Sequence, residues 1–146
     1  MRKRILALLL LTMTVSMLAG CRSGDRGNEL PPGMDKEQVF AQGREVVALL
    51  AAEDWRAVYD RLRQDVKQAT SAQEIGTYMQ EMLQAYGVYQ KETDAIVTGQ
   101  KLDSGEQYAT AVIYCRHEKK DLVYRIAFSA EMELIGFQVK KQSLFG

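Results

Sequence analysis

The side chains best suited to nucleophilic or metal chemistry are scarce, because this chain of 146 residues has one His and two Cys. His117 lies in the polar run 116–120, which predicts an exposed hairpin loop and a solvated imidazole. Cys115 ends the apolar run 109–115, which favours a small buried hydrophobic residue over a reactive thiol. A zinc site needs three or four N or S ligands, and these two residues supply at most two. We therefore expect no metal site.

Motifs for the common hydrolytic and phosphate chemistries are missing from the sequence. It has no glycine-rich phosphate loop and no G-x-S-x-G elbow. Asp94 is the acid with the most apolar neighbours, since an Ala-Ile-Val run follows it, but alternation along a strand can turn it outward. Burial in a pocket would raise the pKa of such an acid and suit it to proton transfer. The sequence locates no pocket, so we assign no catalytic residue and expect no cofactor.

Aromatic residues provide a different kind of candidate site, one that binds a ligand. Tyr and Trp rings have an apolar body and a polar tip, so rings between a sheet and its helices can grip an apolar or ring-bearing ligand. The same rings can instead fill the core with their polar tips at its rim, and this alternative stays open. The candidate pocket-lining residues are Trp55, Tyr59, Tyr78, Tyr86, Tyr114 and Tyr124.

Three helices are predicted between residues 35 and 87, where apolar residues recur at helical spacing. The second helix has its apolar stripe over residues 55–66. Ser71 and Glu74 form a capping box at the start of the third helix. Gly87 follows that helix at the position where a left-handed residue commonly ends one.

Beyond residue 87 the apolar period changes to two, which predicts strands separated by turns. Helices followed by strands indicate an α+β domain, with about three helices packed on an antiparallel sheet of about four strands. The expected strand ranges are 88–97, 107–116, 121–129 and 133–141.

The first twenty residues have the layout of an export signal. Three basic residues precede the apolar stretch 5–18, which is shorter than the roughly 20 residues of a membrane span. The segment 18–21, Leu-Ala-Gly-Cys, resembles the bacterial lipobox, which implies cleavage before Cys21 and a diacylglyceryl group on its thiol. Two acyl chains give stable membrane attachment. We therefore expect a signal peptide at 1–20 and a lipoprotein anchored to the outer face of a bacterial cell membrane.

Residues 21–33 hold both prolines and no hydrophobic periodicity, so they are predicted to form a flexible tether before a single domain at 34–146. The whole sequence has 19 Lys+Arg and 19 Asp+Glu. Without residues 1–20 the numbers are 16 and 19, a formal charge of −3. A mildly acidic domain lacks the charge of a dedicated nucleic-acid binder, so no nucleic-acid partner is expected.

Three short motifs resemble those of the bacterial envelope family called domain of unknown function 3887, over residues 40–141. They are Ala-Ala-Glu-Asp-Trp at 51–55, Gly-Val-Tyr at 87–89 and Glu-Leu-Ile-Gly-Phe at 133–137. That family is similar to the nuclear transport factor 2-like (cystatin-like) fold, so the resemblance implies a curved sheet wrapped against helices. It supplies no catalytic residues.

Together these patterns favour a non-enzymatic envelope lipoprotein whose domain binds a small molecule or another protein. A second copy of the chain or another envelope protein is the expected kind of partner, since antiparallel sheets often pair through an apolar face. The alternative is a small lyase or isomerase that uses a pocket of the same fold. A pocket with an inward carboxylate or imidazole beside aromatic rings would favour that enzyme, whereas a cavity filled by Met79, Met82, Leu83 and Phe128 would favour binding or a structural role.

Overall fold

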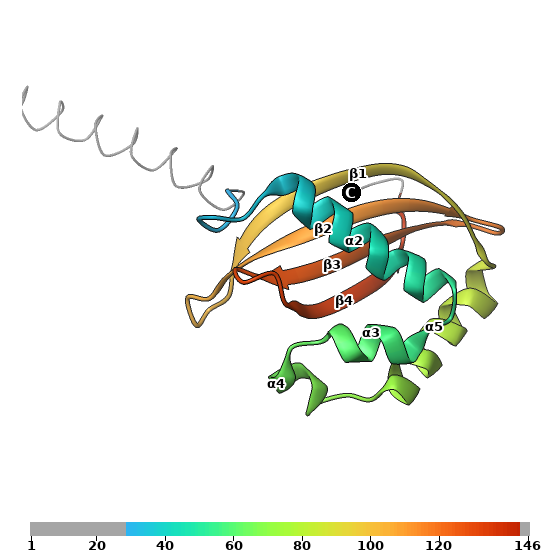
Figure 1. Ribbon diagram of the computed structural model, residues 1–146. Helices are drawn as coiled ribbons and strands as arrows, with labels where there is room; N and C mark the ends of the chain where they lie inside the picture. Colours follow the sequence, from blue (N-terminus) through green and yellow to red (C-terminus); the bar gives the residue numbers. More distant parts are fainter. Residues whose placement is uncertain (1–28, 144–146) are drawn as a thin grey trace, which may run out of the picture.

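The computed structural model describes residues 29–143, which form one four-stranded antiparallel sheet and the helices packed on it (Figure 1). The strand order is β1-β2-β3-β4, so each strand pairs with its neighbour in sequence. This α+β meander confirms the predicted fold class. The helices are α2 (Lys36–Ala51), α3 (Trp55–Arg61), α4 (Gln64–Lys67) and α5 (Ala72–Tyr86). The strands are β1 (Tyr89–Lys101), β2 (Gln107–His117), β3 (Asp121–Ser129) and β4 (Leu134–Lys141).

Side-chain caps determine where the long helices begin. Asp35 accepts a hydrogen bond from the backbone N–H of Gln38 at 2.9 Å, and Ser71 accepts one from the N–H of Glu74 at 3.1 Å. Each cap satisfies a first-turn amide that has no partner inside the helix. Helix α5 ends at Gly87, whose φ of +81° lies in the left-handed region that favours glycine. The predicted cap at Ser71 and the helix end at Gly87 are therefore confirmed. The reciprocal half of the capping box differs from the prediction, because the Glu74 carboxylate accepts its bond from the Thr70 hydroxyl and not from the Ser71 amide.

The second predicted helix is two helices in the structure, because the chain becomes extended at Leu62 and Arg63. The backbone N–H of Arg63 donates to the carbonyl oxygen of Leu134 at 2.8 Å, and Leu62 forms an isolated parallel bridge with Leu134. A helical hydrogen bond is thus replaced by pairing with the edge of β4. The apolar stripe over residues 55–66 does not reveal this break, because the partner strand lies far along the chain.

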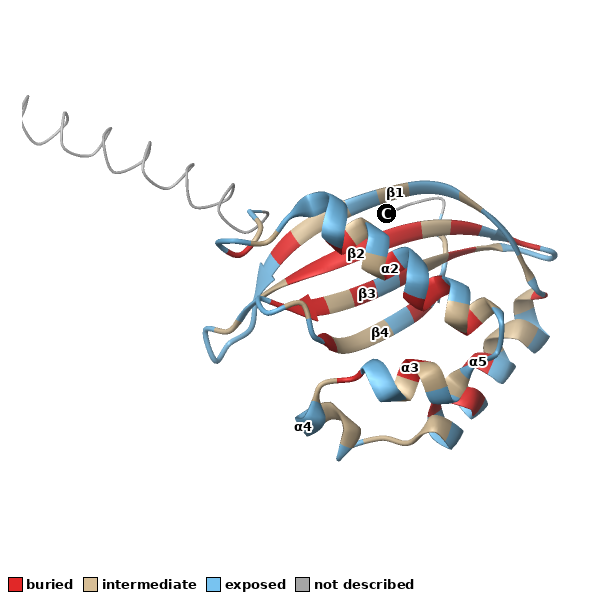
Figure 2. Ribbon diagram, viewed as in Figure 1, coloured by how far each residue is buried: buried red, intermediate tan, exposed pale blue. Residues whose placement is uncertain are grey.

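Alternation along the strands separates a helix-facing side of the sheet from an outer side. Ala111 pairs with Ile126, and Ile113 pairs with Tyr124, on the helix-facing side. All four residues are fully buried. In Figure 2 the buried residues are concentrated in the central strands and on the inward side of α2, so the core lies between this side of the sheet and the helices.

Helix α2 crosses the helix-facing side of the sheet, whereas α3, α4 and α5 lie beside the β4 edge (Figure 1). The close approach of α2 depends on Gly43, which is buried in the middle of the helix. A Cβ atom at this position would lie 2.7 Å from the Cβ of Ala111. A side chain at position 43 would therefore push α2 away from β2.

The described end of the predicted tether, residues 29–33, packs on the domain. Leu30 contacts the core and Pro31 is buried. The backbone carbonyl of Glu29 occupies the space that a Cβ of Gly99 would need, so this segment enters across β1. The packed domain thus begins a few residues earlier than the predicted residue 34.

The predicted export signal 1–20, the proposed lipidation site Cys21 and the first part of the tether lie outside the described residues. Within residues 29–143, no helix combines the length and the apolar character that crossing a membrane requires.

His117 does not lie in an exposed loop, as its polar neighbours predict, but is the last residue of β2 and only 2% exposed. The alternation of β2 places it on the helix-facing side, in line with Cys115. Its Nδ1 lies 2.8 Å from the carbonyl oxygen of Gly87, and its Nε2 lies 3.0 Å from the hydroxyl of Tyr124. Both ring nitrogens therefore have partners, which makes burial of the polar ring possible.

Candidate functional site

A pocket of about 390 Å³ opens between the β4 edge and the helices beside it. Helices α3 to α5 form one wall of this β4 pocket, and the middle of β4 forms the other. A hollow of about 610 Å³ also lies along α5, but most of its lining consists of the helix's exposed polar side chains. The β4 pocket is lined by Leu62, Val66, Thr70, Glu74, Ile75, Tyr78, Gly136, Phe137 and Gln138.

The walls of the β4 pocket are apolar. Leu62 and Ile75 are buried at its base, and Val66 is half-buried on α4. The rings of Tyr78 and Phe137 lie 6.0 Å apart at a tilt of 59°, which is a favourable edge-type aromatic contact. Such a pocket binds an apolar group by removing its surface from water.

Polar groups lie at the rim of the pocket. The Glu74 carboxylate accepts a hydrogen bond from the Thr70 hydroxyl at 3.0 Å. Within residues 29–143, no Lys or Arg forms an ion pair with Glu74. The rim therefore carries one negative charge that a ligand with a cationic group could neutralise.

Arg63 fixes the α4 wall of the pocket to the rest of the domain. Its guanidinium makes a two-pronged contact with Asp65, at 2.8 and 2.9 Å, and a third contact with Glu106 in the β1–β2 hairpin. The hydrogen bonds to these carboxylates raise the pKa of Arg63, and the bond from Arg63 lowers the pKa of Asp65. These contacts hold the N-terminal end of the short helix that carries Val66.

Protein groups also pair with the edge of β4 on both sides of the pocket. The Val139 N–H donates to the Tyr78 hydroxyl, and that hydroxyl donates to the Val139 carbonyl, both at 3.0 Å. At the other end, the Leu134 carbonyl accepts the bond from Arg63. The stretch of edge between these two positions lines the pocket.

A third hollow, of about 240 Å³, continues over β4 onto the outer side of the sheet. It shares Gly136, Phe137 and Gln138 with the β4 pocket. A Cβ atom at Gly136 would meet nothing within 4 Å. The missing side chain therefore leaves the middle of β4 accessible from both sides.

Of the six aromatic residues predicted to line a pocket, Tyr78 lines the β4 pocket and the other five lie elsewhere. Trp55 packs against Gly76 between α3 and α5. The Tyr59 hydroxyl donates to the Lys67 carbonyl at 3.3 Å. The remaining three are Tyr86 at the end of α5, Tyr114 on the outer side of β2 and Tyr124, which is buried in β3.

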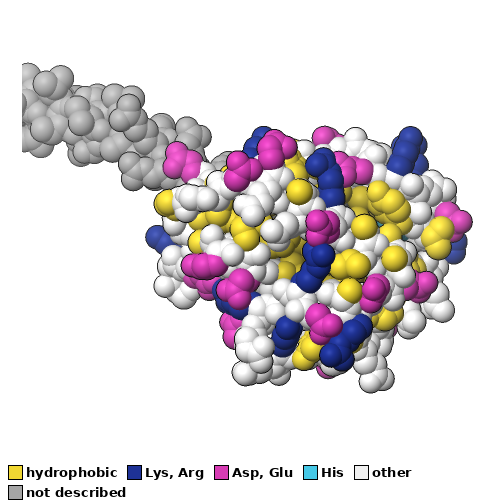
Figure 3. Space-filling model, viewed as in Figure 1, with side chains coloured by type: hydrophobic (Ala, Val, Ile, Leu, Met, Phe, Trp, Pro, Cys, Tyr) yellow, Lys and Arg dark blue, Asp and Glu magenta, His cyan; other side chains and the backbone are white. Residues whose placement is uncertain are grey.

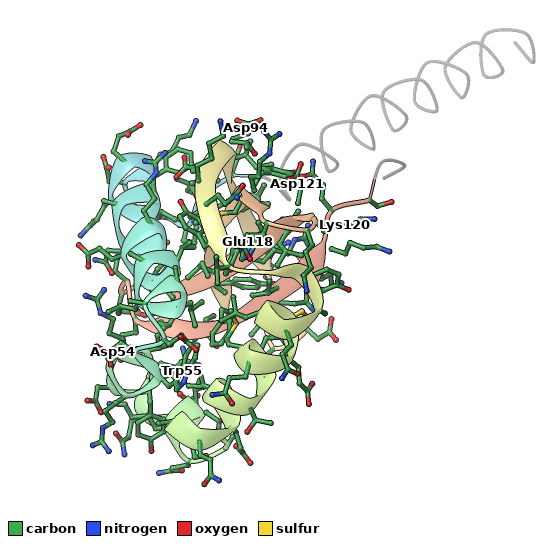
Figure 4. All side chains as sticks on the ribbon, turned by 90° about the vertical axis from the view of Figure 1, so that its right-hand side faces the viewer. Asp54, Trp55, Asp94, Glu118, Lys120 and Asp121 are labelled. Atoms are coloured by element: carbon green, nitrogen blue, oxygen red, sulfur yellow. The ribbon has the colours of Figure 1, made fainter. Side chains whose placement is uncertain are left out.

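The candidates for acid–base and nucleophilic chemistry lie away from this pocket. Asp94 is exposed on β1, and Figure 4 shows it at the opposite end of the domain from Trp55. Cys115 is buried, and this burial raises the pKa of its thiol to about 12, so the reactive thiolate is disfavoured. Among the described residues, no group of three or more His, Cys, Asp or Glu side chains is arranged to hold a metal ion.

Charged side chains of both signs share one face of the domain. On the face shown in Figure 3, acidic and basic side chains are interspersed, with apolar side chains visible between them.

Of the residues that make the β4 pocket, sequence patterns indicated Tyr78 alone. Val66, Glu74 and Gly136 escaped notice because α4 and β4 meet only through long-range pairing, for which a single sequence carries no periodic signal.

Comparisons with known proteins support the architecture. One solved structure, described as an NMR structure of a protein from Ruminococcus gnavus ATCC 29149, aligns with a TM-score of 0.64 and 24% identity. The alignment covers 77% of this chain and 96% of that one, which shows a shared fold. No curated protein matches the chain. A family profile matches residues 43–137, well over half of the sequence, and so the chain belongs to the family described as "Protein of unknown function (DUF3887)".

Proposed function

We propose that the protein is a lipid-anchored, non-enzymatic binding protein on the outer face of a bacterial cell membrane, and that its ligand places an apolar group in the β4 pocket. The observation that carries this proposal is the pocket itself, which has apolar walls, an open mouth and a single carboxylate at its rim. Ligand pockets in proteins commonly have this composition, with mainly apolar walls and few polar groups.

The chemistry of the pocket favours binding over a lyase or isomerase activity. Proton abstraction from a substrate needs a base at the reacting atom and a second group that stabilises the charge that develops. Glu74 is the one carboxylate of the lining, and it lies at the exposed rim. His117 is occupied by two hydrogen bonds inside the core.

The anchoring part of the proposal is supported by residues 1–21, whose basic start, apolar stretch and Leu-Ala-Gly-Cys box form a lipoprotein signal. Glu29, where the chain meets β1, is the eighth residue after Cys21. An extended chain of that length reaches at most about 30 Å. The domain would thus lie close to the membrane surface.

Replacement of Cys21 by serine should release the protein from membranes, because a hydroxyl cannot form the thioether to diacylglycerol. Cell fractionation followed by immunoblotting measures the result. Cys115→Ser is the matched control, since it removes the other cysteine, and it should leave the protein in the membrane fraction. Retention of the Cys21→Ser protein on washed membranes would contradict the anchor.

Replacement of Val66 by glutamine should weaken binding of an apolar probe in the β4 pocket about fivefold. Loss of roughly 40 Å² of apolar contact costs about 1 kcal/mol at 25 cal/mol per Å². The measurement is the fluorescence titration of a neutral apolar dye, Nile red, with the chain from residue 21 carrying Cys21→Ser. Val88→Gln makes the same change at an exposed valine outside the pocket and should leave the dissociation constant unchanged. Equal effects of the two variants would exclude the pocket as the binding site.

A further inference from the structure

The direction of the backbone groups of β4 can be deduced from its hydrogen bonds. In an antiparallel pair, alternate residues direct both their N–H and C=O groups toward one neighbour, and the residues between them direct theirs to the opposite side. Val139 directs both groups to the open edge, where the Tyr78 hydroxyl binds them. Phe137 lies two residues earlier in the same unbroken register, opposite Ile126. Its N–H and C=O therefore also point to the edge.

The backbone N–H and C=O of Phe137 at the edge of β4 have no partner among the described residues. The edge groups before and after them in the strand do have partners. Leu134 is paired with the segment that holds Leu62 and Arg63, and Val139 is paired with Tyr78. The backbone of Phe137 faces the space of the β4 pocket. One donor and one acceptor, at the spacing of a strand, are thus presented to whatever fills that space.

The bridge between Leu62 and Leu134 shows what this edge can accept. There the chain itself adds a short extended segment to β4, in parallel orientation. Strand addition of this kind is a common mode of peptide recognition, in which backbone bonds give affinity and pockets for alternate side chains give specificity. An added strand would lie about 4.8 Å from β4, within the mouth of the pocket.

The side-chain requirement follows from the pleat. Phe137 lies on the helix-facing side, because its partner Ile126 does. A residue paired opposite Phe137 places its side chain on that same side, toward the pocket that Ile75 and Val66 line. That residue should be apolar, and a leucine suits walls formed by aliphatic and aromatic groups.

Charge complementarity supplies a second requirement. The rim carries the Glu74 carboxylate without an ion pair in residues 29–143, and the formal charge after residue 20 is −3. A basic residue next to the apolar one would be attracted by this carboxylate and by the net negative charge of the domain. An acidic residue there would be repelled.

We propose that the β4 edge at Phe137 binds an extended peptide segment of a partner protein, with an apolar residue opposite Phe137 and a basic residue beside it. The inference rests on the proposed binding role of the β4 pocket and names the class of its ligand. Recognition combines two backbone hydrogen bonds, one buried side chain and a favourable electrostatic attraction.

The test uses the full chain, labelled with ¹⁵N and inserted in lipid nanodiscs, and the capped peptide acetyl-Thr-Thr-Leu-Lys-Thr-amide. In the free protein, the amide of Phe137 should exchange with solvent at least tenfold faster than that of Gln138, which is bonded to β3. The peptide should protect the Phe137 amide and leave the Gln138 amide unchanged. The proposal would be overturned if the Phe137 amide is protected from exchange before any peptide is added. Protection that grows with protein concentration, because a second copy of the chain pairs with this edge, would also overturn it.

Matched peptides separate the three contributions. Methylation of the backbone nitrogens of the Leu and the Lys removes the pairing donors in either strand direction, and should weaken binding about tenfold. Replacement of the Leu by Gln should weaken it by a similar factor. Replacement of the Lys by Glu should weaken binding of the peptide to the native protein. The same replacement should weaken binding to the Glu74→Gln variant less.

The peptide results also distinguish this inference from the broader proposal. Equal binding of the methylated and unmethylated peptides, both weakened by Val66→Gln, would overturn strand addition and leave the apolar pocket as the binding site. If Val66→Gln weakens neither Nile red nor the peptide, the pocket itself is not the binding site, and both proposals fail.

Discussion

Replacement of His117 by alanine is expected to lower the free energy of unfolding by about 3 kcal/mol. The carbonyl oxygen of Gly87 can only accept a hydrogen bond, so Nδ1 of His117 carries a proton. In the neutral ring, Nε2 then accepts the hydroxyl proton of Tyr124. Alanine leaves both partners buried without a bond, at about 1–3 kcal/mol for each group, and opens a cavity where the ring was.

The position of His117 makes this loss larger than that of an ordinary surface histidine. Its ring stacks on that of Tyr124, with centroids 5.8 Å apart, and meets Tyr89 edge-on at 5.9 Å. Its bond to Gly87 joins the end of β2 to the turn where α5 passes into β1. The side chain therefore holds together the junction between the helical half and the sheet.

Urea unfolding, followed by circular dichroism, measures this effect, and Tyr124→Phe is the informative companion. That variant removes only the hydroxyl, so it should cost about 1–2 kcal/mol in the native protein. In the His117→Ala background the hydroxyl has already lost its partner, and the same change should cost less than about 0.5 kcal/mol. Equal costs in both backgrounds would show that the two side chains are not coupled.

His117 also illustrates which features local sequence signals can predict. The cap at Ser71 and the left-handed Gly87 are determined by residues within one turn of the chain, and both were predicted correctly. The environment of His117 comes from Gly87, 30 residues before it, and from the opposite strand. Its polar neighbours indicated a loop because their side chains are indeed exposed, although the ring is not.

The candidate pocket shows the same division between local and long-range information. Alternation predicted four strands and the side of the sheet that Phe137 occupies. It did not predict that Leu62 and Arg63 leave the helix to pair with β4, and this pairing forms one side of the β4 pocket. The aromatic residues were identified by type, but only Tyr78 has its hydroxyl at the edge of β4. A pocket at a strand edge depends on which strand is last in the sheet, and that order is a property of the whole fold.

The packing of α2 on the sheet leads to the second large prediction. Glycine in a helix interior costs about 1 kcal/mol relative to alanine, so Gly43 is unfavourable for the helix taken alone. The compensation is close contact with β2, where a Cβ would meet Ala111 at 2.7 Å and the Cδ1 of Ile113 at 3.4 Å. Gly43→Val is therefore expected to destabilise the protein by about 3 kcal/mol, because its Cβ and two methyl groups have no space in this close-packed interface.

Two comparisons identify the cause of this loss. Ala48→Val adds a β-branched side chain to the exposed face of the same helix and should cost less than about 1 kcal/mol in urea unfolding. Gly43→Ala introduces a Cβ without the two methyl groups of valine, and Ala111→Gly removes the atom that this Cβ meets at 2.7 Å. The double variant should therefore be more stable than the sum of the two single effects predicts, by about 1 kcal/mol or more. If the effects of the two substitutions on the free energy of unfolding are additive, α2 can shift away from the sheet at no cost in stability. The contact of Gly43 with Ala111 would then not hold the helix against the sheet.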